Sequence, residues 1–111
     1  MESMKLIEIV HSIESFDEEG TIFALKHEGK YMPSSEAVVI DMTDEELQRP
    51  TIEIADKYCP GKSYFLDVFI IKEFLEDWAS NHNGKLPSDE LACELLIYYA
   101  EYDSYPEEFF S

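Results

Sequence analysis

The chain places an amphipathic helical pattern at each end, with short apolar runs between the two. In residues 4–15, Leu6, Val10 and Ile13 recur at helical spacing and Ile7 widens the apolar stripe. Near the other end, Ser88 stands in the N-cap position of a helix that Pro106 ends. The inward face that we expect for this last helix is Leu91, Leu95, Tyr98 or Tyr99, and Tyr102.

The middle of the chain alternates between strand and helix patterns. We expect residues 21–26 and 36–41 to be strands that pair antiparallel across a loop at 27–35, and residues 63–66 to be a third strand. Asp67 then begins a helix that ends near Asn81. Thr43 and Glu46 have the spacing of a capping box, which predicts a short helix before Pro50.

Residues 51–58 fit either a strand or a helix, and we favour the helix. The sequence therefore predicts an α+β fold: a small antiparallel sheet of about three strands, packed with about four helices and with helices at both ends of the chain. A length of 111 residues suits a single domain over 1–111.

The charge balance limits the kinds of partner. Twenty-five acidic residues oppose eight basic ones, which leaves a net charge of -17. Such a charge repels nucleic-acid phosphates and anionic lipids, so direct binding to nucleic acid or membrane is not expected. It attracts basic proteins and speeds their association. The alternative is that the acidity serves solubility alone.

Cysteine usage and hydropathy point to a cytoplasmic protein. Cys59 and Cys93 lack CxxC spacing, and we expect both to be free thiols. The first residues lack the basic start and long apolar run of a signal peptide, and no stretch reaches the length needed to span a bilayer. A monomer or a weak dimer fits this description.

The sequence offers little support for catalysis, and we expect no cofactor, no metal and no enzymatic activity. His11, His27 and His82 are far apart and form no metal-binding motif, and no phosphate-binding or nucleophile motif is present. We expect His11 to be partly buried beside the apolar stripe of the first helix. The alternative is a small enzyme in which His11 or His82 meets two carboxylates in a pocket.

Aromatic and acidic residues alternate near the C-terminus, where residues 86–111 contain no Lys or Arg. Rings that lose water on binding provide affinity, and charges of one sign around them speed association, so this pattern is typical of a protein interface. The residues that we predict to bind a partner here are Tyr98, Tyr99, Glu101, Tyr102, Asp103, Tyr105, Glu107, Glu108 and Phe109. Two further acidic candidates are the cluster that includes Asp17, Glu18 and Glu19, and residues 41–46, which include Asp44 and Glu45.

In size, acidity and α+β pattern the chain resembles the small immunity proteins of bacterial contact-dependent growth inhibition and other polymorphic toxin systems. The order of elements in the C-terminal half, where a strand enters a helix through Asp67 and a later helix carries Tyr98 and Tyr99 followed by Asp103, also resembles a group of small bacterial domains. The resemblance implies an inhibitor, made in the producing cell, that binds a cognate basic toxin domain such as a nuclease. The alternative is an acidic adaptor or nucleic-acid mimic that regulates an endogenous nucleic-acid enzyme.

Overall fold

The computed structural model describes residues 3–104, and a four-stranded antiparallel sheet lies at the centre of this part of the chain. The strands are β1 (Met4–Lys5), β2 (Thr21–Ala24), β3 (Glu36–Ile40) and β4 (Ser63–Asp67), in the order β1-β3-β2-β4. β2 and β3 pair antiparallel, with Thr21 opposite Ile40 and Ala24 opposite Ala37, as predicted. The fold is therefore α+β, with one more strand than the sequence indicated.

The additional strand corrects the prediction of one helix over residues 4–15. Met4 and Lys5 pair with Ala37 and Glu36 at the edge of the sheet, and the helix α1 begins only at Leu6 (Leu6–His11). A short 3-10 helix, η1 (Ile13–Ser15), follows. The apolar spacing was read correctly, because Leu6, Val10 and Ile13 are all buried. Met4 and Lys5 nevertheless pair with a strand that lies far along the chain.

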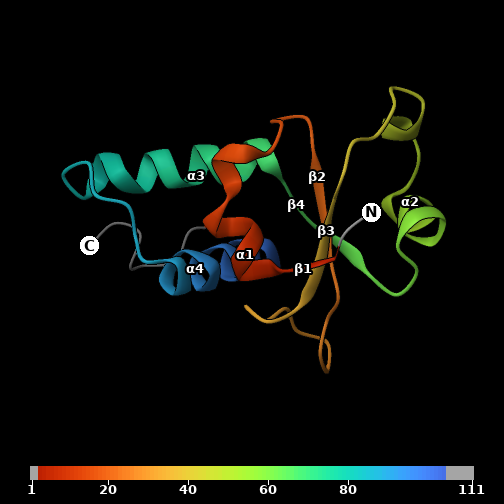
Figure 1. Cartoon of the computed structure of the whole chain (residues 1–111), viewed down its shortest axis with the longest axis horizontal. Helices are drawn as coiled ribbons and strands as arrows, with labels where there is room; N and C mark the ends of the chain where they lie inside the picture. The colour runs from red at the N-terminus through yellow and green to blue at the C-terminus, as the bar shows by residue number, and fades with distance from the viewer. Residues whose placement is uncertain (1–2, 105–111) are drawn as a thin grey trace.

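Helices cover the two faces of the sheet unequally (Figure 1). On one side lie α1, α3 (Val68–Asn81) and α4 (Asp89–Tyr102), and on the other lies α2 (Thr51–Tyr58) with the short 3-10 helix η2 (Glu46–Gln48). Alternate residues of β2 serve the two sides: Ile22 and Ala24 belong to the larger buried cluster, and Phe23 belongs to the smaller one. This alternation follows from the two-residue period of a strand.

The smaller cluster lies under α2. Its buried members are Phe23, Val38, Ile40, Ile54, Ala55 and Cys59. The larger cluster joins the other face of the sheet to α1, α3 and α4, and includes Phe65, Phe74 and Trp78. Cys93 lies in this larger cluster, and both cysteines are free, as expected.

Asp67 lies between β4 and α3, as predicted, but it does not cap the helix with its side chain. Its carboxylate instead accepts a hydrogen bond from the Thr21 hydroxyl, at 3.1 Å. The backbone N–H of Val68 donates to the carbonyl of Gly20, at 2.9 Å. The strand therefore passes into the helix without an intervening loop.

The helix α4 begins as predicted, because the hydroxyl of Ser88 accepts a hydrogen bond from the N–H of Leu91. The helix ends at Tyr102, before Pro106, and Asp103 follows with a left-handed backbone, φ 53°. The buried residues of α4 are Ala92, Cys93, Leu95 and Leu96. Tyr99 is partly buried against the larger cluster, whereas Tyr102 faces solvent, contrary to the prediction that it points inward.

Candidate protein-binding surface

The outer side of α4 exposes a pair of tyrosines one helical turn apart. Tyr98 and Tyr102 are 40% and 59% exposed, and their ring centroids lie 4.5 Å apart. The sequence left open which of Tyr98 and Tyr99 faces outward, and the structure answers it: Tyr98 is exposed, while the Tyr99 ring meets Phe74 edge to face at 5.6 Å. Tyr98 and Tyr102 thus form an exposed aromatic surface on a helix that the core holds in place.

Carboxylates surround these two rings. Glu94 and Glu101 are exposed on α4, and Asp103 is exposed just beyond its end. None of the ion pairs formed within residues 3–104 includes any of these three side chains. Their charges are therefore not held in direct ion pairs, and they add to the field of a strongly acidic protein.

A hollow of about 350 Å³ lies beside this surface, between α4, β4 and the loop that joins β2 to β3. Its lining includes four aromatic residues, Tyr31, Tyr64, Phe65 and Tyr99. It also carries Glu101 and Asp103 together with Lys26 and Lys30. The prediction that charges of one sign surround the aromatic residues therefore holds along α4 itself, but two lysines from a distant loop face its C-terminal end.

Tyr31 anchors that loop to the edge of the sheet. Its hydroxyl donates to the carbonyl of Tyr64 at 2.6 Å and lies 2.8 Å from the hydroxyl of Ser63, and its ring meets Phe65 at 5.0 Å between centroids. Burial raises the pKa of Tyr31, although the hydrogen bond with Ser63 acts in the opposite direction. Burial, with the nearby charge of Asp67, also raises the pKa of Tyr64 to about 12, so both rings stay neutral at physiological pH.

The tip of the same loop is a tight turn. His27 and Lys30 exchange two backbone hydrogen bonds, at 2.7 and 3.0 Å. Glu28 and Gly29 between them both have positive φ, 53° and 80°, as a type I′ hairpin turn requires. This turn brings Lys26 and Lys30 to the wall of the hollow.

Four of the predicted site residues belong to the tail of the chain. Tyr105, Glu107, Glu108 and Phe109 lie outside the described residues. The part of the predicted surface that the structure brings together is therefore Tyr98, Tyr99, Glu101, Tyr102 and Asp103, of which Tyr99 contributes to the hollow and not to the outer side of α4.

The second acidic candidate lies at the turn between η1 and β2. Asp17, Glu18 and Glu19 are exposed, and one oxygen of Asp17 accepts a hydrogen bond from the N–H of Glu19 at 3.0 Å. The neighbouring ring, Phe16, packs against the larger cluster. The acidic group of Asp17, Glu18 and Glu19 thus presents charge without an exposed aromatic side chain beside it.

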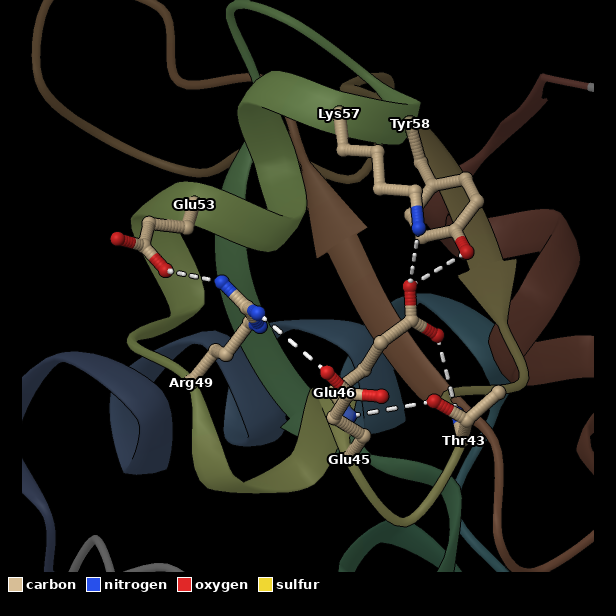
Figure 2. A network of polar contacts seen from close by, with 7 residues as sticks. All are labelled: Thr43, Glu45, Glu46, Arg49, Glu53, Lys57 and Tyr58. Atoms are coloured by element: carbon tan, nitrogen blue, oxygen red, sulfur yellow. Dashed lines mark hydrogen bonds and ion pairs between the residues drawn. The ribbon is translucent and has the colours of Figure 1, made fainter.

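The third candidate, residues 41–46, combines exposed carboxylates with one that is buried. Glu46 is only 7% exposed, and its carboxylate accepts hydrogen bonds from the N–H of Thr43, from Lys57 Nζ at 2.9 Å and from the Tyr58 hydroxyl at 2.6 Å (Figure 2). These donors lower the pKa of Glu46 to about 2, the backbone of Thr43 contributing most. The hydrogen bond with Glu46 in turn raises the pKa of Lys57.

Glu45 also has a cationic neighbour. Arg49 lies between Glu45 and Glu53, with nitrogen to oxygen distances of 3.5 and 3.7 Å (Figure 2). Of the predicted acidic stretch, Asp41 and Asp44 are the exposed carboxylates outside these ion pairs in the described chain. Glu46 is thus part of a polar joint between η2 and α2, and the prediction that the exposed Asp44 and Glu45 contact a partner stays a prediction. The capping-box spacing of Thr43 and Glu46 was correct, and both of its hydrogen bonds are present.

The histidines do not gather into a reactive site. His11 is not partly buried, as we expected: its side chain is 70% exposed, and its Nδ1 lies 2.6 Å from a carboxylate oxygen of Asp89. His82 stacks on Trp78 at 3.9 Å, with Nδ1 2.8 Å from the carbonyl of Trp78. Burial raises the pKa of Cys93 to about 12, which keeps the thiol protonated. No group of three or more potential metal ligands occurs among residues 3–104.

Both edges of the sheet are poor templates for strand addition. The edge strand β1 has only two residues. At the other edge, the pairing of β4 with β2 is irregular between Ile22 and Phe23, and the carbonyl of Tyr64 is occupied by Tyr31. Short and irregular edges disfavour pairing with a further strand, so a partner is better accommodated by side chains than by the sheet.

No helix within the described part of the chain combines the length and apolar character that crossing a bilayer requires. Comparison of the chain with protein-family models, with curated proteins and with solved structures finds no match.

Proposed function

We propose that this protein binds a basic protein through the outer side of α4, and that it is an immunity protein that neutralises a cognate bacterial toxin domain in the cytoplasm of the producing cell. The observation that carries the proposal is the exposed pair of Tyr98 and Tyr102, set among carboxylates that form no ion pair within residues 3–104. Two adjacent rings on a fixed helix can lose water on contact, and the carboxylates around them steer a basic partner.

A nuclease is the toxin class that best fits this surface. An enzyme that cleaves nucleic acid must be basic where it meets phosphate, so an acidic inhibitor is complementary to that region. The protein itself, at a net charge of -17, would repel the nucleic acid and not compete for it by direct binding.

The proposal is tested by expressing the gene found immediately upstream, first alone and then together with this protein. We expect the neighbour to be toxic alone and harmless in the presence of this chain. A harmless neighbour would contradict the immunity proposal and favour the acidic adaptor or nucleic-acid mimic, whose target would then be sought among endogenous nucleic-acid enzymes.

The same assay tests the surface. The double substitution Tyr98→Ala with Tyr102→Ala removes both exposed rings, and we expect it to weaken binding about 100-fold or more, because buried tyrosines at an interface contribute heavily. Ile52→Ala is a matched control, since Ile52 is an exposed apolar residue on α2, across the sheet from α4. Equal protection by the double variant and the wild type would contradict the proposed surface.

A further inference from the structure

The hollow between α4 and the β2–β3 loop has walls of opposite chemical character. Tyr31, Tyr64 and Tyr99 supply ring surface. Glu101 and Asp103 supply negative charge on the side of α4, and Lys26 and Lys30 supply positive charge on the side of the loop. Its volume of about 350 Å³ lies at the lower end of the range of small-molecule sites.

The C-terminal end of α4 favours a cation in this hollow. The last turn of α4 contains no basic residue, so the negative end of its helix dipole is not compensated from within the helix. Asp103 follows directly and adds a formal charge at the same end. Helix dipole and carboxylates therefore act in the same direction here.

The ring of Tyr31 already has a cation beside it. Lys26 Nζ lies 5.0 Å from the centroid of this ring, within the range of a cation–π contact. The contact is intramolecular and exposed, because Lys26 is a surface residue. The aromatic lining of the hollow thus already holds a positive group, the ammonium of Lys26.

From these observations we infer that the hollow receives one arginine side chain of the basic partner, whose guanidinium displaces Lys26 from the ring of Tyr31 and meets Glu101 and Asp103. This inference rests on the proposed function and names a contact that the partner makes. Arginine fits better than lysine, because a planar guanidinium can stack on a ring and bind a carboxylate through two N–H groups at once.

The probe for this inference is ethylguanidinium chloride, titrated into the full chain and followed by amide shifts in ¹H–¹⁵N spectra. We expect shifts confined to the lining of the hollow, in the loop at residues 26–31, in β4 and at residues 99–103. The neutral variant Glu101→Gln with Asp103→Asn should weaken this binding at least about threefold. Asparagine tolerates the left-handed backbone at position 103, so the fold is retained.

The substitution Lys26→Gln tests whether the hollow prefers a positively charged ligand. A cation site should bind ethylguanidinium more tightly when this lysine is removed, because a like charge and a competitor for the ring disappear together. Unchanged or weaker binding in Lys26→Gln would overturn the inference. Shifts spread equally over Asp17, Glu18 and Glu19 would also overturn it, because they would show a general attraction to negative charge.

Failure of this inference and failure of the proposed function give different results. If the probe ignores the hollow while Tyr98→Ala with Tyr102→Ala still abolishes protection, the function stands and the arginine contact is wrong. If the probe binds the hollow but the upstream gene product is harmless, the cation site stands and the immunity function is wrong.

Discussion

The two sides of the sheet use acidic residues in opposite ways. Residues 43–62, which contain η2 and α2, carry five carboxylates and three basic residues, and each of those three basic residues lies within ion-pair distance of a carboxylate. Residues 68–104, which contain α3 and α4, carry eight carboxylates and two lysines. One of the two, Lys72, donates to the carbonyl of Phe16 and not to a carboxylate.

This difference shows that acidic residues in one sequence can have different structural roles. Around α2, three of the five carboxylates form ion pairs with Arg49 or Lys57, and one of them, Glu46, closes the joint between η2 and α2. Along α4, they remain exposed and contribute to the long-range field. Under the proposed function only the second arrangement would help to capture a basic partner, so substitutions on the two sides should have different consequences.

The largest effect should come from the core of the smaller side. Phe23 is fully buried beneath α2, and Phe23→Ala should lower the free energy of unfolding by about 3 to 5 kcal/mol, because it removes a large side chain and leaves a cavity. Urea denaturation measures the change. Phe69→Ala is the control, since Phe69 is half exposed on α3 and should have little effect. Similar losses for both variants would show that the assignment of the core is wrong.

Glu46 and Glu45 test the neutralised joint directly. Glu46→Gln should destabilise the protein more than Glu45→Gln, because Glu46 is enclosed by three donors and Glu45 is largely exposed. The pKa of Glu46 falls from 4.5 to about 2 on folding, so its ionised form stabilises the folded state above pH 4.5, and this contribution disappears as the pH falls toward 2.

Urea denaturation at a series of pH values measures this effect. The gap in stability between the wild type and Glu46→Gln should narrow as the pH is lowered from 6 to 2, whereas no such narrowing is expected for Glu45→Gln. A gap that stays constant over this range would contradict the role of the Glu46 carboxylate.

A smaller effect is expected on the rate of association with the partner. Glu94→Lys with Glu101→Lys should slow binding about tenfold at low salt, and the difference should fade as salt is added. Asp44→Lys with Asp56→Lys changes the net charge equally at exposed positions around α2 and is the matched control. Stopped-flow mixing measures both rates. Equal slowing by both pairs would mean that total charge, and not its position on α4, controls capture.

The smallest effect should come from the start of α4. Ser88→Ala removes the acceptor of the Leu91 N–H, which should reduce the free energy of unfolding by about 1 kcal/mol. Thr51→Ala at the first residue of α2 is the comparison, because Pro50 occupies the N-cap there and no side chain caps that helix. Thermal unfolding measures both, and a larger loss for Thr51→Ala would contradict the assignment of the cap.

Much of the fold could be predicted because local patterns decide it. The strands at 21–26 and 36–41, the helix at 51–58 and the cap at Ser88 all follow from spacing and from residue type. The strand β1 could not be foreseen, since two residues carry no period of their own and pair with Ala37 and Glu36 far along the chain.

The candidate site was less predictable for the same reason. Helical geometry requires that one of the adjacent Tyr98 and Tyr99 faces outward. Which of the two does so depends on how α4 packs against the rest of the protein. Two of the three partners of Glu46 lie eleven and twelve residues away, and Lys26 and Lys30 reach α4 only through the tertiary fold. Sequence periodicity does not record such contacts, so the hollow could not be anticipated.

The direct passage from β4 into α3 has a mechanical consequence. With Asp67 held by Thr21 and the N–H of Val68 held by Gly20, the junction has no hinge about which α3 could swing away from the sheet. The helix α3 also packs against α4 through Phe74 and Tyr99. A partner that docks on α4 therefore meets a surface already in its final shape, and the complex would lose little conformational entropy as it forms.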